Sequence, residues 1–257
     1  MRPRIDINCD LGESYGAFKV GSDEEIMPHI TSANVACGFH AGDPTTMKRT
    51  VGTAKKHGVA VGAHPGFPDL MGFGRREMQL THEELTDLMI YQMGALQAFA
   101  KAAGVVLQHL KPHGALYNMA AKDESVAEPV VEAARVSDAK LIVLAPPGSV
   151  LAEAAVRAGL RVAFEVFADR TYNSDGSLVS RKQSNAIICE PREVVERAVK
   201  MVMEKSVVAA DGKVVGFGEV HTICVHGDTM GAVKLAETLK KGLLRAGVKV
   251  ESLDRFV

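Results

Sequence analysis

The amino-acid sequence predicts an α/β fold, a seven-stranded parallel (β/α) barrel of the TIM-like type. Seven short apolar segments alternate with segments of helical periodicity along the 257 residues, and this alternation favours parallel strands joined by right-handed crossovers. No G-x-G-x-x-G motif follows the first strand, and polar side chains follow six of the seven strands. A doubly wound sheet gathers its functional groups at one switch point, whereas a barrel collects them from many strand ends. We therefore expect a barrel, either closed or with an open seam.

The sequence shows neither an internal repeat nor a low-complexity linker that would mark a domain boundary. We therefore expect residues 1–257 to form one barrel domain, a length typical of this architecture. One segment departs from the alternation of strands and helices, because Asp211-Gly212 lies between two apolar runs. That pattern predicts a small β-hairpin insertion near residues 207–220.

The predicted strands differ in their patterns. In the first, Asp6, Asn8 and Asp10 alternate with apolar residues, so these three polar side chains share one face. The fifth is a short, continuous apolar run, which is typical of a strand buried on both faces. In chain order, the predicted strands are residues 4–10, 30–37, 59–63, 105–111, 140–145, 161–166 and 222–225.

Capping residues mark the predicted helices. The helix after the second strand has Asp43 as its N-cap, followed by a proline, and it ends at Gly58. Thr81 and Glu84 form a capping box that opens a long helix ending at Gly104. The remaining predicted helices open at Ser125 with Glu128 and cover about residues 150–158, 191–205 and 231–246.

Composition excludes several classes of partner and site. The formal net charge is -1 and no basic cluster is present, which argues against nucleic-acid binding. No run of eighteen apolar residues or apolar leader occurs, so we expect no membrane span and a cytoplasmic protein. The cysteines lack C-x-x-C spacing, and we expect them to be reduced and structural: Cys9, Cys37, Cys189 and Cys224.

The candidate functional residues lie where predicted strands end. Each alone has a structural interpretation as a cap, a solvated strand end or a surface ion pair. Because six strand ends share this polar character, we expect most of them to converge on one rim of the barrel. Arg75, in a glycine-rich loop, is a further candidate because a guanidinium binds carboxylates bidentately. The strand-end residues are Asn8, Asp10, Glu13, His40, His64, Lys111, His113, Glu165, Asp169, Arg170, His226 and Asp228.

The absence of known motifs excludes several classes of catalytic site but leaves two kinds of site possible. There is no P-loop, no G-x-S-x-G nucleophile elbow and no H-E-x-x-H zinc helix. Carboxylates and imidazoles together suit either general acid–base hydrolysis or a divalent metal ion. Asp10, His40 and His64 are the candidate metal ligands, and the sequence leaves these two kinds of site open.

Six sequence blocks carry a resemblance to a known family. The two most distinctive read CGFHAGDP, from Cys37, and KPHGALY, from Lys111. Together the blocks cover nearly the whole chain in order, and the chain resembles the 5-oxoprolinase A-subunit family, also called LamB/YcsF-like. Thr229-Met230 departs from the pattern, because the family often has proline after the threonine. The blocks are residues 7–13, 33–44, 64–76, 110–118, 165–170 with Asp175-Gly176, and 224–228.

The resemblance implies an ATP-dependent hydrolase that opens the lactam of 5-oxo-L-proline to L-glutamate. It also implies two partner subunits and a barrel similar to those of sugar deacetylases and glycosidases. ATP is a co-substrate of the whole complex, and we expect the partners to handle it because this chain lacks a nucleotide motif. A divalent metal remains an open alternative.

The convergent strand ends suggest roles for individual residues. Asp10 or His113 would be the general base, while Lys111, His40 and His64 would stabilise developing negative charge. The other candidate residues would bind substrate. Two alternatives stay open at this point: a stand-alone, metal-dependent deacetylase or amidohydrolase, and a non-catalytic protein that only binds the lactam.

Overall fold

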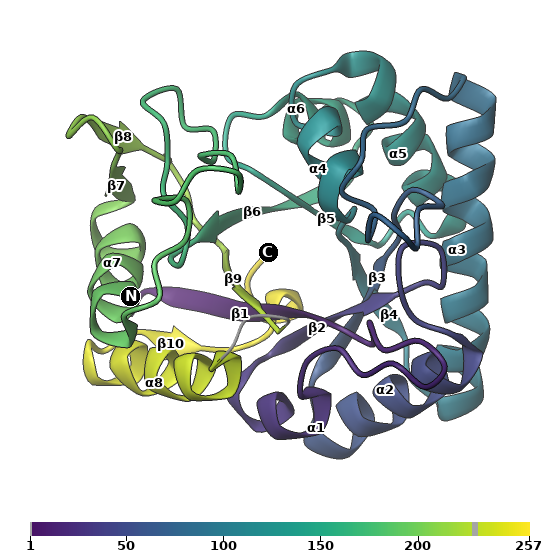
Figure 1. The fold of residues 1–257 in the computed structure, drawn as a ribbon, viewed down its shortest axis with the longest axis horizontal. Helices are drawn as coiled ribbons and strands as arrows, with labels where there is room; N and C mark the ends of the chain where they lie inside the picture. The colour runs from purple at the N-terminus through teal and green to yellow at the C-terminus, as the bar shows by residue number, and fades with distance from the viewer. Residues whose placement is uncertain (1, 228–230) are drawn as a thin grey trace.

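Seven parallel strands form a closed barrel in the computed structural model, which describes residues 2–227 and 231–257 (Figure 1). The strands are hydrogen-bonded in the order β1-β2-β3-β4-β5-β6-β9, and β9 pairs with β1 to close the ring. The expected seven-stranded barrel is thus confirmed, without an open seam. The barrel strands are β1 (Arg4–Leu11), β2 (Ser32–Ala36), β3 (Ala60–His64), β4 (Leu107–Leu110), β5 (Ile142–Ala145), β6 (Arg161–Phe167) and β9 (Thr222–His226).

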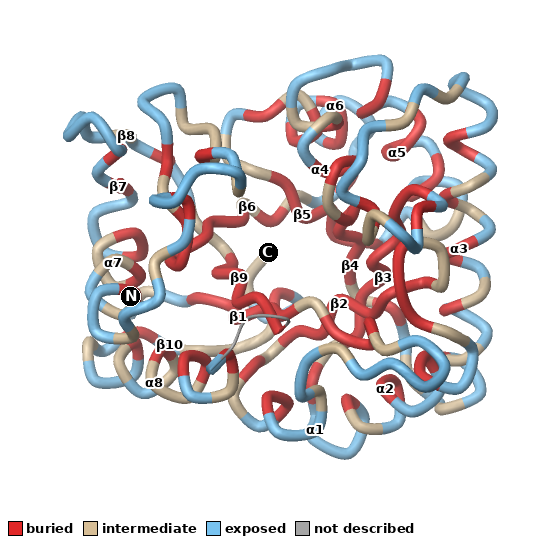
Figure 2. Tube along the Cα trace, in the orientation of Figure 1, coloured by how far each residue is buried: buried red, intermediate tan, exposed pale blue. Residues whose placement is uncertain are grey.

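Helices surround the barrel, and their outer faces are exposed while the strands are buried (Figure 2). The predicted caps at Asp43 and Thr81 both form, the second as a complete capping box with Glu84. Gly58 and Gly104 end their helices in the left-handed conformation. The longer helices are α2 (Pro44–His57), α3 (His82–Ala103), α5 (Glu124–Ser137), α6 (Val150–Arg157), α7 (Pro191–Glu204) and α8 (Ala232–Arg245).

One predicted cap was wrong. Helix α5 begins two residues before the predicted position because the carboxylate of Asp123 accepts the backbone N–H of Ser125 at 2.9 Å. The Ser125 hydroxyl donates to the same carboxylate at 2.7 Å instead of capping the helix. Asp123 thereby satisfies one of the helix's otherwise unpaired N–H groups.

Several short elements were not predicted. Helices of one or two turns are too short to show a helical period, and a strand of two residues is too short to show alternation. Among them, α4 (Gly114–Ala120) matters most, because it begins directly after the strand-end segment that contains Lys111 and His113. The others are α1 (Asp23–Ile26), η1 (Met27–His29), β10 (Lys249–Val250) and η2 (Leu253–Arg255). Strand β10 pairs with β1 outside the ring.

A two-stranded antiparallel ribbon lies apart from the barrel between α7 and β9. It consists of β7 (Ser206–Val208) and β8 (Val214–Gly216), with Asp211-Gly212 in the turn between them. Among the described helices, none combines the length and the apolar character that crossing a membrane requires.

The part of the barrel interior that β1 faces is polar, which follows from the alternation in this strand. Ile5, Ile7 and Cys9 pack in the apolar core, and Asp6 and Asn8 are fully buried on the opposite face. Asp6 accepts hydrogen bonds from the hydroxyls of Thr31, Ser32 and Thr222. Burial nevertheless outweighs these bonds and raises the pKa of Asp6 to about 6.

The raised pKa of Asp6 predicts a pH-dependent cost to the folded state. Between pH 3.8 and about 6 the native protein binds more protons than the unfolded chain, so this residue lowers stability as the pH rises. Asp6→Asn should therefore gain about 3 kcal/mol relative to the parent between pH 4 and 7. Urea unfolding across this range measures the difference. Asp87→Asn, which removes an exposed carboxyl, should show no such gain, and an equal gain in both variants would contradict the assignment.

Candidate active site at the carboxyl ends of the strands

The site is built around the buried ammonium group of Lys111, which directly follows β4 and is 3% exposed. Its Nζ lies 2.9 Å from Asp10 Oδ1, 3.0 Å from Glu165 Oε1 and 3.0 Å from Cys224 Sγ. Burial disfavours the charged form, but the neighbouring carboxylates outweigh it and raise the pKa of Lys111 well above its ordinary value. Lys111 is therefore a permanent cation between carboxylates from β1 and β6.

Asparagine side chains hold these carboxylates in place. Asn34 donates through Nδ2 to Asn8 Oδ1 at 2.7 Å and to Asp10 Oδ1 at 2.8 Å. Asn8 in turn donates to Glu165 Oε1 at 2.9 Å. His109 Nε2 lies 2.7 Å from Asn34 Oδ1, where it acts as the donor. These contacts link β1, β2, β4 and β6 across the barrel, so the position of each group depends on closure of the ring.

Glycine at position 62 makes room for this network. A Cβ at Gly62 would lie 2.1 Å from the ring of His109, far inside contact distance. The small residue in β3 thus allows an imidazole from β4 to reach the barrel centre.

Tyr117, on α4, is a site residue that sequence reasoning missed. Its hydroxyl donates to Glu165 Oε2 at 2.6 Å, and burial followed by the nearby Glu165 raises the pKa of the phenol well above its usual value. The only available signal was its place in the KPHGALY block, six residues after Lys111. Since Tyr117 stays protonated, it donates permanently to Glu165.

A second part of the site consists of three buried histidine rings and Glu13. His113 Nδ1 lies 2.9 Å from His64 Nε2, and the rings of His40 and His113 stack 3.7 Å apart, nearly parallel. Glu13 Oε1 lies 3.4 Å from His40 Nε2 and 3.7 Å from His113 Nδ1. His64 Nε2 lies 3.5 Å from Asp10 Oδ1, so this cluster adjoins the Lys111 centre.

His40 is set apart by its ring nitrogens. Both are buried, and neither has a hydrogen-bond partner among the described residues. Burial, followed by the neighbouring His113 and His64, lowers the pKa of His40 well below its ordinary value. A neutral imidazole has one N–H donor and one acceptor. Of the two nitrogens, Nε2 faces the Glu13 carboxylate at 3.4 Å.

Tight glycine contacts position the histidine rings. A Cβ at Gly66 would lie 2.7 Å from His40 Nδ1, and one at Gly74 would lie 2.7 Å from His40 Cβ. Between these glycines, Phe73 adopts a positive φ of 53°, a conformation that costs a bulky residue of order 1–3 kcal/mol. The loop after β3 thus closes over the rings at the expense of backbone strain.

The remaining predicted site residues divide into two groups. Asp169 Oδ2 pairs with His226 Nδ1 at 2.7 Å, and a ligand atom of His226 lies within 4.8 Å of ligand atoms of Asp10 and Cys224. Burial raises the pKa of Asp169, but the facing His226 and Arg170 outweigh it and lower the pKa below its usual value. This pair therefore extends the site toward β9.

Two arginines make contacts outside the cluster, and one expected aspartate lies outside the described residues. Arg170 donates to the backbone carbonyls of Ala186 and Val179, so its guanidinium holds a loop in place. The guanidinium of Arg75 lies 4.9 Å over the ring of Phe73. Asp228, expected to bind substrate, and the neighbouring Thr229-Met230 lie outside the described residues.

Among the described residues, two groups of donors come close enough together to suggest a metal ion, and each has a feature that limits which ligands it could supply. In the first, Asp10, Cys224 and His226, the ammonium of Lys111 already lies 2.9 Å from the carboxylate and 3.0 Å from the sulfur. In the second, Glu13, His40, His64 and His113, the stacked rings of His40 and His113 differ by only 3° in orientation. Imidazole lone pairs lie in the ring plane, so two parallel rings cannot direct theirs at one ion.

The expected metal ligands Asp10, His40 and His64 are divided between these two groups. Asp10 Oδ1 is paired with Lys111, and His64 Nε2 faces His113. The positive charge that the structure shows between these carboxylates is that of Lys111.

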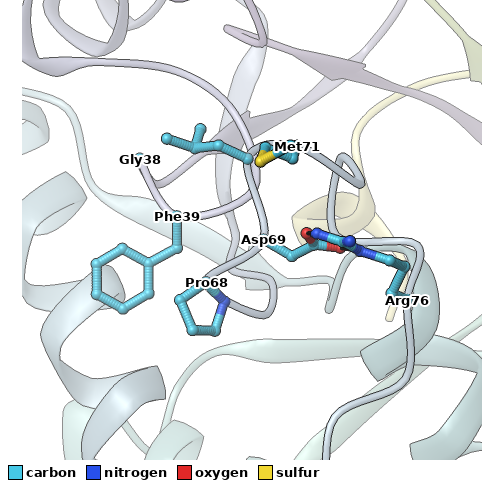
Figure 3. Close-up of a pocket in the computed structure, with 7 residues that line it drawn as sticks. Gly38, Phe39, Pro68, Asp69, Met71 and Arg76 are labelled. Carbon is cyan, nitrogen blue, oxygen red and sulfur yellow. Dashed lines mark hydrogen bonds and ion pairs between the residues drawn. The ribbon is translucent and has the colours of Figure 1, made fainter.

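A hollow of about 350 Å³ lies on the rim beside the histidine cluster (Figure 3). Asp69 and Arg76, which form an ion pair, line part of it, together with Phe39 and Pro68. Phe39 immediately precedes His40. The lining includes neither Lys111 nor any of the three histidines, so the hollow is separate from the acid–base groups.

Removing the Lys111 cation should destabilise the fold. Lys111→Met leaves the buried Asp10 and Glu165 without their shared cation, which should cost about 3–5 kcal/mol of unfolding free energy. Urea unfolding at pH 7 measures this loss. Lys56→Met, on the exposed face of α2, should change stability by less than about 0.5 kcal/mol. A comparably small effect of Lys111→Met would show that the carboxylates do not depend on it.

Comparisons with known proteins agree with this geometry. Proteins named as the A subunit of 5-oxoprolinase, from Tolumonas auensis and Pyrococcus abyssi, are 52% and 53% identical to this chain. The alignments cover 97% and 99% of this chain, respectively, and 99% of each relative. The crystal structure of a lactam utilization protein from Thermus thermophilus matches with a TM-score of 0.91 and 47% identity, covering 96% of this chain and 99% of the other.

More distant structures share only the barrel fold. The structure of T48 deacetylase with substrate matches with a TM-score of 0.50 and 15% identity, covering 99% of this chain and 90% of the other. The model of the LamB/YcsF family matches residues 5–257. That match and the close relatives lead to one conclusion: the chain belongs to the LamB/YcsF family.

Proposed function

We propose that this chain is the lactam-opening component of an ATP-dependent 5-oxoprolinase, the hydrolase that converts 5-oxo-L-proline to L-glutamate. The observation that carries the proposal is the buried Asp10–Lys111–Glu165 cluster, in which a cation and two carboxylates are held together at the carboxyl ends of the strands. The names of the close relatives supply the substrate and the expectation of partner subunits.

The chemistry of the substrate explains why ATP is needed. A lactam is resonance-stabilised, so its carbonyl carbon is a poor electrophile. Phosphorylation of the lactam oxygen by ATP, with ADP released, would make the ring carbon electrophilic. Water would then add to that carbon and the C–N bond would break, leaving an acyl phosphate whose hydrolysis gives glutamate and inorganic phosphate. Because the sequence carries no P-loop, we assign ATP binding to the two partner subunits and the ring-opening step to this barrel.

Asp10 is the group we assign as general base. Burial raises the pKa of a carboxyl, but the charges of His64 and Lys111 outweigh it and hold the pKa of Asp10 well below its ordinary value. It therefore stays ionised and can accept a proton from an attacking water molecule. Lys111, 2.9 Å away, stabilises the negative charge that develops on the substrate, and we assign the same role to His40 in the adjoining histidine cluster.

Activity should depend on the partner subunits. The isolated chain should turn over neither ATP nor 5-oxoproline, because it lacks the phosphate-binding motif that substrate activation requires. Mixed with its two partners, it should produce glutamate and ADP together. The measurement follows both products for the chain alone, the partners alone and the mixture.

The reconstitution separates the proposal from its rivals. ATP-coupled glutamate formation by the chain alone would contradict partner dependence, and no glutamate from a correctly assembled mixture would contradict the assigned reaction. Hydrolysis of acetylated sugars by the chain without ATP would identify it as a deacetylase instead.

Loss of the base should abolish turnover while leaving the barrel folded. Asp10→Asn keeps the shape and the contact to Asn34 but removes the proton acceptor, so the reconstituted complex should lose at least about 10²-fold in kcat. Asp87→Asn, on the exposed face of α3, is the matched control and should retain full activity. A protein that only binds the lactam would tolerate the change at Asp10, and full turnover would therefore exclude Asp10 as base.

A further inference from the structure

Two buried imidazoles, those of His64 and His113, each donate one ring N–H to a backbone carbonyl. His64 Nδ1 lies 2.7 Å from the carbonyl oxygen of Lys111, and His113 Nε2 lies 2.8 Å from that of Phe73. A carbonyl oxygen only accepts, so in a neutral imidazole the opposite nitrogen is left with a lone pair. Those two nitrogens, His64 Nε2 and His113 Nδ1, lie 2.9 Å apart. The backbone thus directs two lone pairs toward the same place.

The carboxylate of Glu13 approaches this place from the loop after β1. Its Oε1 lies 3.7 Å from His113 Nδ1, too far for a hydrogen bond between them. The ligand atoms of Glu13, His64 and His113 all lie within 4.8 Å of one another. Two donors that each lie about 2.1 Å from a zinc-like ion are about 3.0 Å apart at a right angle and about 3.4 Å apart at the tetrahedral angle. Separations of 2.9 and 3.7 Å bracket this range, so the donors are spaced as ligands of one ion.

We propose that Glu13, His64 and His113 form a binding site for one divalent first-row transition-metal ion. The ligand atoms are Glu13 Oε1, His64 Nε2 and His113 Nδ1, so only His64 is shared with the ligands expected from the sequence. Two imidazoles and a carboxylate suit zinc and its first-row neighbours, whereas calcium and magnesium prefer oxygen donors. The hydrogen bonds to the carbonyls fit this role, because ligating histidines typically donate their other N–H to an outer acceptor that fixes the ring.

The charges around the site favour a divalent ion over a proton shared by the two rings. In the Lys111 centre and the histidine cluster, one ammonium group faces three carboxylates, those of Asp10, Glu13 and Glu165. A divalent ion balances the excess of two negative charges, whereas a shared proton would leave one of them uncompensated at a costly, desolvated position. Arg75 also acts on these rings, but it is exposed, so water and salt screen its charge.

His40 belongs to the histidine cluster but not to the proposed ligand set. Its ring lies 3.7 Å from that of His113 and only 3° from parallel. An ion in the plane of the His113 ring therefore lies outside the plane that contains the His40 lone pair. His40 Nε2 lies 3.4 Å from Glu13 Oε1 instead, beside the carboxylate ligand. Three protein ligands leave a coordination position for water or substrate, which is typical of catalytic rather than structural metal sites.

Asp10 lies next to the proposed site and stays outside it. Its Oδ1 lies 3.5 Å from His64 Nε2 and 2.9 Å from Lys111 Nζ. An ion bound to His64 places positive charge on one side of this carboxylate, as Lys111 does on the other. When bound, the ion supplies a Lewis acid beside the assigned base. That use rests on the proposed function, whereas binding of the ion is a property of the folded chain alone.

The test uses the full-length chain, freed of metal with a chelator and titrated with Zn²⁺ by calorimetry at pH 7. We expect one ion to bind per chain. Glu13→Gln keeps the shape of the ligand but removes its charge, and it should weaken Zn²⁺ binding at least about 10²-fold, the most that loss of an outer partner of a metal ligand typically costs. Glu83→Gln, at an exposed position in the first turn of α3, should bind as the parent does. His40→Phe, which keeps a ring to stack on His113, should also bind as the parent does.

Nuclear magnetic resonance of the chain labelled with ¹⁵N in its histidine rings identifies the ligand atoms. Saturation with Zn²⁺ should shift the resonances of His64 Nε2 and His113 Nδ1, while the other nitrogen of each ring keeps its proton. The rings of His40 and of the exposed His57 should show no bound metal. The resonances are assigned through bonds to the backbone of the unmodified chain, so this result stands even where a variant fails to fold.

Three results would overturn the proposal. The first is the absence of stoichiometric Zn²⁺ binding, and the second is binding that leaves His64 Nε2 and His113 Nδ1 unshifted. The third is loss of binding in Asp10→Asn with parental binding in Glu13→Gln, which would identify the ligands expected from the sequence. Because the titration needs neither ATP nor partner subunits, it can fail while the proposed reaction stands, and reconstituted turnover can fail while the ion binds.

Discussion

The buried ammonium of Lys111 holds the centre of the barrel together. It neutralises Asp10 on β1 and Glu165 on β6, two carboxylates that would otherwise be costly to bury together. The cost of desolvating the three charges is offset only because the carboxylates also have hydrogen-bond partners, from Asn8, Asn34 and Tyr117. Packing and electrostatics are therefore coupled at the centre of the barrel.

This coupling explains why the barrel interior is polar beside β1. A barrel of seven strands brings side chains from opposite strands close together, and around Lys111 they are joined by hydrogen bonds. On β5 and β6, Ile142, Leu144 and Ala163 instead form an apolar cluster with Leu253. The apolar face of β1 packs instead in the hydrophobic core between strands and helices. The strands thus stabilise the fold on one face and hold ionisable groups on the other, within the same few residues.

The histidine cluster likewise holds ionisable side chains in fixed positions, beside the loops after β1, β2, β3 and β4. His64 is the last residue of β3, whereas the rings of His40 and His113 are placed by close glycine contacts and by a strained phenylalanine. Strain of this kind is maintained only where the surroundings overdetermine the backbone. The Lys111 centre and the histidine cluster meet where His64 approaches Asp10, so this carboxylate contacts Lys111 on one side and the histidine cluster on the other.

Local patterns along the chain were enough to predict the barrel, since period-two and helical spacing, caps and glycine stops depend on near neighbours in the sequence. Strand ends also identified Asp10, His64, Lys111 and Glu165, because parallel strands direct their carboxyl ends to one rim. The same patterns failed for α4 and the α5 cap, where a single turn or one competing carboxylate decides the outcome.

Only the tertiary structure decided which polar side chains contact one another. Arg170 and Glu165 look equivalent as polar residues at the end of β6, yet one holds a loop and the other reaches Lys111. The roles of Tyr117 and Asn34, like the charge of the site, follow from distances between residues far apart in the chain, and sequence spacing does not encode those distances.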